Sequence, residues 1–222
     1  MKIKLISHSQ TPKVAVPLEA LDLVAYCARV SNPGNQNNTE TNKKLVKYLM
    51  KHKHWSPLEM VSVCLEVETT RDIARQLLRH RSFSFQEFSQ RYADPTKDLD
   101  FEIREARLQD PNNRQNSITT DDGLLQHGWA DMQQKVIDTA LEAYNYALSN
   151  GIAKEQARAV LPEGNTLSRL YVNGTLRSWI HYIELRGANG TQQEHMDIAH
   201  TVADVIAEIF PLAEEFKNME LL

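Results

Sequence analysis

The feature that most restricts how this chain can fold is a cluster of positive charge. Residues 71–91 contain five of the thirteen arginines but only two acidic side chains, so the segment carries a net charge of +3. Arg79, His80 and Arg81 are consecutive, and two cationic groups about 6 Å apart repel by roughly 3 kcal/mol at an effective dielectric of about 20. The fold must therefore leave these groups in solvent or bring an anion to them.

The rest of the chain is acidic, and this limits the kind of anion that it can bind. The 222 residues carry a net charge of −4, which leaves −7 outside the cationic segment. Nucleic acids and membrane surfaces are polyanionic, and an acidic protein repels them. We therefore expect a small anionic ligand, with neither nucleic acid nor a membrane as a partner.

Composition and cysteine usage indicate an ordinary globular protein of the cytoplasm. Hydrophobic residues make up 41% and charged residues 24% of the chain, which is typical of soluble domains. The N-terminus has too short an apolar run for a secretory signal. Cys27 and Cys64 lie apart in apolar surroundings, as reduced core thiols do. His195 and His200 are five residues apart and form no zinc-binding helix face, so we expect no metal.

Hydrophobic periodicity predicts an α/β protein of the α+β type, rich in helix, with a small mixed or antiparallel sheet. Strands are expected at residues 2–7, 60–68, 101–107 and 167–173. Helices are expected at residues 18–30, 39–53, 71–80, 122–149, 153–162, 175–186 and 191–216, the last broken near Pro211. The stretch after residue 80 is expected to continue its helix irregularly. We see no repeat and no long linker, so residues 1–222 are expected to form a single domain.

The end of the helix at 71–80 carries the donors that a phosphate group needs. Gln76, Arg79 and His80 share one helix face because they lie three and four residues apart. More hydroxyl, guanidinium and aromatic side chains follow: Phe83, Ser84, Phe85, Phe88, Ser89 and Arg91. Guanidinium and hydroxyl groups can hold a phosphate, and aromatic rings can cover a planar ligand. The alternative is a solvated helix end with a few surface ion pairs.

The same segment resembles the signature of a known enzyme family. Arg79-His80-Arg81, followed after seven residues by Ser89, resembles the R-H-R-x₇-S signature of flavin-dependent thymidylate synthases. Other blocks are similar to that family and keep its order: His54-x-Ser56-Pro57, Ala157-Arg158-x-x-Leu161-Pro162, and Leu176-Arg177 through Leu185-Arg186.

The resemblance implies a reductive methylation. The methylene group of 5,10-methylenetetrahydrofolate would be transferred to C5 of dUMP and reduced to methyl, and NADPH would reduce the cofactor FAD. The products would be dTMP and tetrahydrofolate. The resemblance also implies a homotetramer whose active sites combine several subunits. A module that binds a nucleotide or flavin without turnover remains the alternative.

The resemblance also implies roles for individual residues. The expected FAD contacts are Ser56, Arg79, His80, Arg81, Glu87, Thr175, Leu176, Arg177 and His181. The expected dUMP contacts are Gln76, Leu77, Leu78, Arg79, Glu87, Phe88, Ser89, Gln90, Arg91, Arg158 and Arg186. Arg186 is also the expected catalytic residue, because it resembles the arginine that contacts the uracil ring and favours charge development there.

Several of these residues keep a second interpretation. Arg158 alone fits a plain helix end, and Arg186 can extend its charged head into solvent beside an apolar stripe. His54 and His80 can be structural. Ser89 would need an adjacent base to act as a nucleophile, and we interpret it as a ligand of the substrate.

This chain departs from the family pattern at a few positions. It has Gln86 before the glutamate, and Thr175 and His181 in the flavin-binding blocks, where the family often has asparagine. All three side chains can still form hydrogen bonds. We therefore expect the details of flavin contact, rather than the cofactor itself, to differ.

Overall fold

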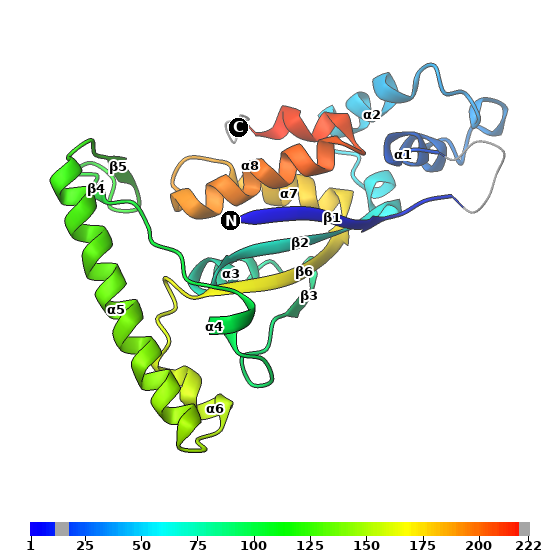
Figure 1. Cartoon of the computed structure of the whole chain (residues 1–222). Helices are drawn as coiled ribbons and strands as arrows, with labels where there is room; N and C mark the ends of the chain where they lie inside the picture. Colours follow the sequence, from blue (N-terminus) through cyan, green and yellow to red (C-terminus); the bar gives the residue numbers. More distant parts are fainter. Residues whose placement is uncertain (12–17, 218–222) are drawn as a thin grey trace. The chain divides into compact units, whose positions relative to one another are not determined.

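A computed structural model describes residues 1–11 and 18–217 of the chain (Figure 1). The chain divides into two compact units, and each is described by itself. The first unit contains residues 1–2, 67–79 and 86–170, and the second contains residues 3–66, 80–85 and those from 171 onward. The expectation of a single domain over residues 1–222 stays a prediction.

Within the described residues, the main sheet has four strands in the spatial order β1-β2-β6-β3. Their bounds are Lys2–His8 for β1, Ser62–Thr70 for β2, Ser84–Glu87 for β3 and Leu167–Thr175 for β6. The amide of Leu176 donates to the carbonyl of Val61 at 2.9 Å, and that of Arg71 donates to Thr166 at 3.0 Å. The end of each central strand therefore meets the start of the other, and β2 and β6 are antiparallel.

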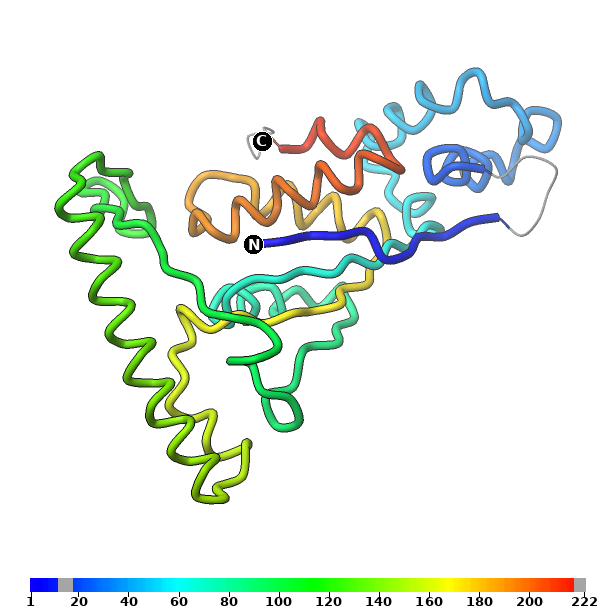
Figure 2. Tube along the Cα trace, in the orientation of Figure 1, coloured from blue at the N-terminus to red at the C-terminus, as the bar shows by residue number. Residues whose placement is uncertain are grey.

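The first unit is mostly helical. Its elements are α3 (Arg71–Leu77), α4 (Pro95–Asp98), β4 (Arg107–Gln109), β5 (Ser117–Thr119), α5 (Gly123–Ser149), α6 (Lys154–Ala157) and the 3₁₀ turn η3 (Arg158–Val160). The carboxylate of Asp122 caps α5 by accepting from the amides of Leu124 and Leu125. The antiparallel hairpin of β4 and β5 lies at the N-terminal end of α5, and α6 lies at its C-terminal end (Figure 2).

The second unit has its core around two helices. Its elements are α1 (Ala20–Ala28), η1 (Pro33–Asn35), α2 (Asn42–Lys51), η2 (Ser56–Met60), α7 (Leu176–Arg186), α8 (Gln193–Ala207) and η4 (Pro211–Phe216). The apolar stripe expected on α7 is confirmed: Leu176, Trp179, Ile180 and Ile183 are fully buried. Figure 1 shows α8 lying beside α7. The indole of Trp179 donates to the carbonyl of Val63 at 3.0 Å, which ties α7 to β2.

Two local expectations are wrong. The helix at 71–80 ends at Leu77, and residues 84–87 form the strand β3 instead of continuing it. The chain turns back because the amide of Phe88 bonds to the carbonyl of Arg169 at 2.8 Å, at the edge of the sheet. The strand expected at 101–107 is also absent from the described structure: Phe101 forms an isolated bridge with Thr166, and β4 begins at Arg107.

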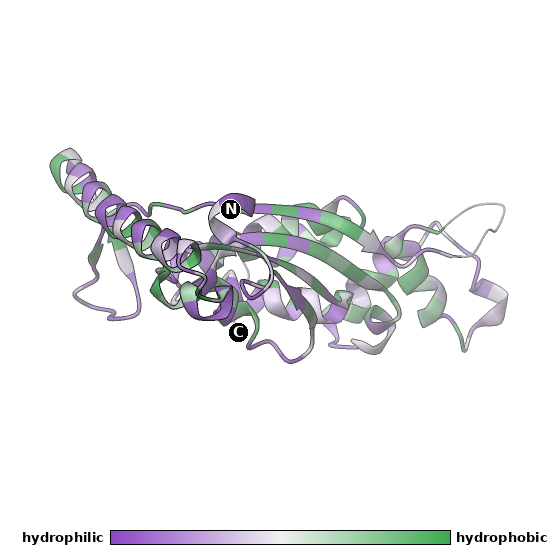
Figure 3. Ribbon diagram, turned by 60° about the horizontal axis from the view of Figure 1, so that its bottom comes forward, coloured by the Kyte–Doolittle hydropathy of each residue, from purple (hydrophilic) through white to green (hydrophobic). Residues whose placement is uncertain are grey.

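Hydrophilic residues interrupt α5, the longest helix described, along its whole length (Figure 3). Among residues 1–11 and 18–217, no helix combines the length and apolar character that crossing a bilayer requires. Cys27 and Cys64 are free thiols, as expected, but both are half-buried instead of lying in the core. Burial raises the pKa of both thiols.

Gly174 provides a test of the packing between β6 and the loop that carries the arginine cluster. A Cβ at this position would lie closer than 3.0 Å to the ring of Phe83. We expect Gly174→Ala to lower the free energy of unfolding by about 1–3 kcal/mol, because the ring must move out of its site. Urea denaturation measures the change. Gly34→Ala is the matched control, since its Cβ would meet nothing within 4 Å, and equal effects of the two changes would contradict this packing.

Candidate active site

The predicted nucleotide-binding residues of the first unit include cations that no acid neutralises. Arg79 follows α3 and is exposed, and Arg158 follows α6 and is half-buried. Neither side chain has a hydrogen-bond or ion-pair partner within residues 1–11 and 18–217. Arg91 forms a long ion pair, 3.7 Å from Glu155, and its guanidinium lies 5.8 Å from the ring centroid of Tyr92. These guanidinium groups are therefore available to an anion.

Glu87 is held by one of its two carboxylate oxygens. Its Oε1 accepts from the hydroxyl of Ser168 at 2.8 Å and from Arg71 at 3.4 Å. Ser168 is completely buried in β6, so its hydroxyl is a fixed donor. Oε2 has no partner in the part of the chain that the structure describes. One oxygen is thus anchored while the other can accept from a hydroxyl of a ligand.

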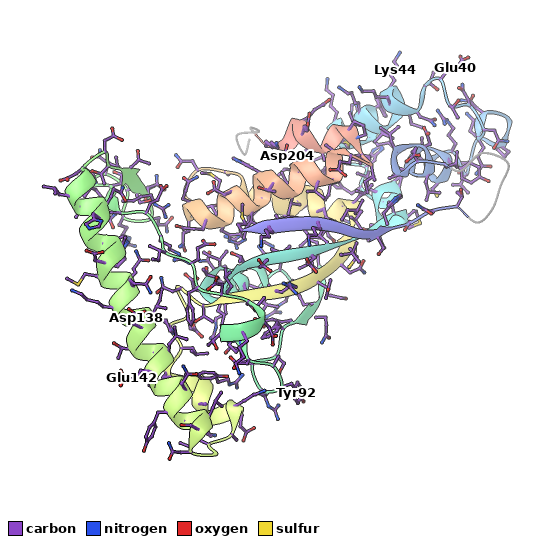
Figure 4. The ribbon with its side chains drawn as sticks, viewed as in Figure 1. Glu40, Lys44, Tyr92, Asp138, Glu142 and Asp204 are labelled. Carbon is purple, nitrogen blue, oxygen red and sulfur yellow. The ribbon has the colours of Figure 1, made fainter. Side chains whose placement is uncertain are left out.

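The loop after β3 contains a buried amide without a hydrogen bond. Gln90 is only 3% exposed, and its Nε2 has no partner among the described residues. Such a group costs about 1–3 kcal/mol if nothing bonds to it, so its environment fits a ligand or an ordered water. Tyr92, by contrast, points outward from this loop (Figure 4) and is 76% exposed.

Ser89 begins a turn in the same loop. Its carbonyl accepts from the amides of Tyr92 and Ala93, both at 3.1 Å. In the described residues no base is hydrogen-bonded to its hydroxyl. This agrees with a binding role for Ser89, because a nucleophilic serine needs such a base.

The end of α3 offers fewer side chains than the sequence suggested. Leu77 is completely buried in the core, so only its main chain is left to contact a nucleotide. Leu78 caps the helix through its amide, which donates to Ala74 at 2.9 Å. The half-buried Gln76 and the exposed Arg79 are the polar side chains of this turn.

The predicted flavin-binding residues of the second unit gather at the start of α7. Thr175 caps this helix, because its hydroxyl accepts from the amide of Ser178 at 3.3 Å. Arg177 forms an ion pair with Glu59 of η2, the turn that begins at Ser56. Leu176 lies between them in sequence, but its side chain is buried in the core. The motif around Ser56 and the start of α7 are thus neighbours.

One turn further along α7, His181 joins the same group. Its ring meets the ring of Trp55 at a centroid distance of 4.6 Å, and its Nδ1 lies 3.3 Å from the carboxylate of Glu184. The two rings meet edge-to-face, at an interplanar angle of 63°, so α7 also contacts the residue that precedes Ser56.

The loop that carries the signature motif also packs along α7. The hydroxyl of Ser178 donates to the carbonyl of Ser82 at 3.3 Å, and the ring of Phe83 lies 4.4 Å from that of Trp179. Arg81 is exposed and has no partner among the described residues. The predicted flavin-binding residues of the second unit therefore lie on η2, on this loop, on α7, or, for Thr175, at the end of β6.

At the end of α7, Arg186 bonds to His80 of the signature. Its Nε donates to Nε2 of His80 at 3.0 Å. Arg186 is half-buried, and its two terminal nitrogens have no partner within the described ranges. Arg186 is thus held at its Nε and does not simply extend into solvent, which was the alternative interpretation.

Two neighbours of this pair were missed by sequence reasoning. Tyr182 and His195 are buried against His80, with ring centroids 5.0 and 6.2 Å away. Burial raises the pKa of Tyr182. Burial, and then the charge of Arg186, lower the pKa of His195 to about 3. The sequence carried one available signal, a histidine on the apolar face of a helix.

The depressed pKa of His195 predicts a stability that depends on pH. The pKa of His195 is lower in the folded chain than in the unfolded chain. As the pH drops below about 6.5, the unfolded chain therefore binds a proton that the folded chain does not bind, and the free energy of unfolding falls. We expect the free energy of unfolding to lose about 2 kcal/mol from pH 7 to pH 5 relative to His195→Gln. Urea denaturation of both proteins at the two pH values measures this difference. Parallel pH profiles would show that His195 is protonated inside the fold.

Comparison with known proteins gives matches along almost the whole chain. Residues 13–212 match the family model described as thymidylate synthase complementing protein. The chain is 49% identical over 211 residues to the probable flavin-dependent thymidylate synthase of Paramecium bursaria Chlorella virus 1, covering 95% of this chain and 96% of the relative. It is 44% identical over 214 residues to the flavin-dependent thymidylate synthase of Synechocystis sp., with the same coverage of both chains.

A solved structure agrees with these matches. The UMP/dUMP methylase PolB from Streptomyces cacaoi, in a crystal structure bound with 5-Br dUMP, superposes with a TM-score of 0.79 and 28% identity. The superposition covers 96% of this chain and 93% of that one. The helix-rich α+β fold, the signature motif and the matched relatives agree, and the chain belongs to the family of flavin-dependent thymidylate synthases.

Proposed function

We propose that this chain methylates dUMP to dTMP, with 5,10-methylenetetrahydrofolate as carbon donor and NADPH-reduced FAD as the source of hydride, releasing tetrahydrofolate. One observation carries the proposal beyond family membership. Arg79, Arg81, Arg158 and Arg186 have no acidic partner among the described residues, although the chain has a net charge of −4. The chain has enough acidic residues to neutralise these arginines, but none is paired with them, and this arrangement fits sites for anionic ligands.

The second unit offers groups that suit a flavin dinucleotide. Arg81 is a free cation for the pyrophosphate, and Trp55 and His181 present rings to a planar group. Arg177 and Thr175 lie at the N-terminus of α7, where the helix dipole favours an anion. When bound, FAD supplies the hydride that reduces the transferred carbon to methyl. The role of the chain is to orient this cofactor and to exclude water around it.

The first unit offers groups that suit a nucleoside monophosphate. Arg79 and Arg158 can bind the phosphate, and each charge-assisted hydrogen bond contributes about 1.5–3 kcal/mol. Oε2 of Glu87 can accept from a sugar hydroxyl. The buried amide of Gln90 can donate to the ligand. In the second unit, Arg186 is the proposed catalytic residue, because its free N–H groups can stabilise negative charge on the uracil ring.

Purified protein tests the proposal directly. We expect it to contain FAD, seen by its absorption spectrum, and to form dTMP only when methylenetetrahydrofolate and NADPH are both supplied. Arg186→Ala should reduce dTMP formation by at least about 100-fold, as the loss of one transition-state donor does, while the fold and FAD content survive. Arg114→Ala, an exposed arginine outside the predicted site, should retain activity.

Binding of dUMP or FAD by wild-type protein without any turnover would contradict the proposed reaction. That result would favour a non-catalytic binding module, an alternative that no observation on this structure supports. Loss of the fold in Arg186→Ala, seen by circular dichroism, would show that Arg186 is structural rather than catalytic.

A homotetramer is proposed as the working assembly, and α5 supplies the structural reason. Leu125, Trp129, Met132 and Val136 are each 41–56% exposed and follow one another at intervals of four, three and four residues. They therefore form one apolar stripe on the helix surface. Helical spacing turns Asp138 and Glu142, which are labelled on α5 in Figure 4, away from this stripe. A second copy of this chain can bury the stripe through symmetric helix pairing.

A charge placed in the stripe tests the assembly. We expect Val136→Glu to dissociate the oligomer, because pairing would bury a carboxylate without a partner. Size-exclusion chromatography with light scattering gives the mass, which for wild-type protein should be four times the chain mass of 25.4 kDa. Glu142→Lys on the opposite side is the control and should leave the mass unchanged. An unaltered mass for Val136→Glu would exclude the stripe from the interface.

A further inference from the structure

A buried group of rings surrounds the point where Arg186 is held. Tyr182 and Arg186 lie four residues apart and share one face of α7. His195 comes from α8, and His80 comes from the loop that follows α3. The centroid of the Tyr182 ring lies 5.0 Å from that of His80 and 5.7 Å from that of His195. Tyr182 is 1% exposed and His195 is fully buried, so these rings are fixed by packing.

The hydrogen bond between Arg186 and His80 requires one form of the imidazole. The Nε of an arginine always carries a hydrogen, so it can only donate. Nε2 of His80, which lies 3.0 Å away, must therefore present its lone pair. An imidazolium has no lone pair and would repel the guanidinium. His80 is thus neutral, with its proton on Nδ1.

The surrounding rings hold His80 in the required orientation. His80 meets Tyr182 at an interplanar angle of 83° and His195 at 86°, so both contacts are edge-to-face. His80, Arg186 and Tyr182 are charged or titratable groups that lie around His195. His195 stays neutral at working pH because its pKa is lowered to about 3. It therefore adds no positive charge beside the Arg186–His80 pair.

We propose that His195 and Tyr182 are positioning residues for the catalytic arginine and act through His80. Their rings hold His80 with Nε2 toward Arg186, and this nitrogen occupies the Nε–H of the guanidinium. The two terminal nitrogens of Arg186 remain as a pair of donors for a planar acceptor such as a pyrimidine carbonyl. The inference deepens the proposed function and rests on it, since Arg186 serves the nucleotide only if the chain binds one.

The tautomer of His80 provides the test, because it can be read without any activity. Nitrogen NMR of FAD-loaded, full-length protein labelled at histidine distinguishes protonated from unprotonated Nδ1 and Nε2, and His80→Gln identifies the His80 signals. We expect wild-type His80 to be neutral and protonated only at Nδ1. In His195→Leu, which removes the ring, the two tautomers should mix, and the kcat for dTMP should fall about tenfold with a smaller change in the KM for dUMP.

Two further variants separate positioning from simple core filling. Tyr182→Phe retains the ring and removes a hydroxyl that has no hydrogen-bond partner among the described residues, so the tautomer should be unchanged. Arg186→Lys keeps the charge but removes the Nε–H donor, so both neutral tautomers of His80 should then be populated. This test remains available even if His195→Leu fails to fold.

Several results would overturn the proposal. A wild-type His80 that is cationic or protonated at Nε2 contradicts it, and so does a tautomer that is unchanged in folded His195→Leu or in Arg186→Lys. Absence of dTMP formation in wild-type protein would instead refute the proposed function, and the NMR result would still report whether His80 is held as described.

Discussion

Positive charge without an acidic partner is the constraint on which the rest of this structure depends. Most arginines of the chain are paired with acids or bonded to the main chain, as Arg104 is with Asp72 and Arg169 with Glu68. Arg79 and Arg81 of the signature motif have no such partner within the described residues. In an acidic protein, groups left in this state suit anionic ligands, and both FAD and dUMP carry phosphates.

The fold explains how the motifs reach useful positions. In the second unit, a fully buried stripe on α7 anchors the helix, and the polar residues between the buried ones face η2 and the signature loop. In the first unit, a buried serine of β6 fixes one oxygen of Glu87. In both units a rigid core residue therefore holds a polar neighbour in place, which is how a preorganised site is built.

Periodicity predicted the long or strongly patterned elements and failed for the short ones. The stripe of α7, the length of α5 and the alternation of β2 were visible in the residues themselves. The strand β3 has four residues and follows a helical pattern, so local sequence favoured continuing the helix. Its actual state depends on a bond between Phe88 and Arg169, which are far apart in the chain. Among the strands that the structure describes, β5 pairs only with β4, and it carries no strong pattern.

The site was predictable only as far as its motifs extended. The signature gave Arg79, His80 and Arg81, but it could not show that Leu77 and Leu176 turn their side chains into the core. Nor could it show the contact of His80 with Tyr182 and His195, since those residues follow it by more than a hundred positions. Such contacts arise from tertiary packing, and a single sequence does not reveal them.

Calorimetric titration of dUMP into FAD-loaded protein tests most directly whether the unpaired arginines bind anions. We predict that Arg158→Gln weakens the affinity for dUMP by at least about tenfold, because a charge-assisted bond to phosphate is lost. Arg114→Gln removes a more exposed charge outside the predicted site and should leave the affinity unchanged. Equal affinities for wild-type protein and Arg158→Gln would contradict the central claim.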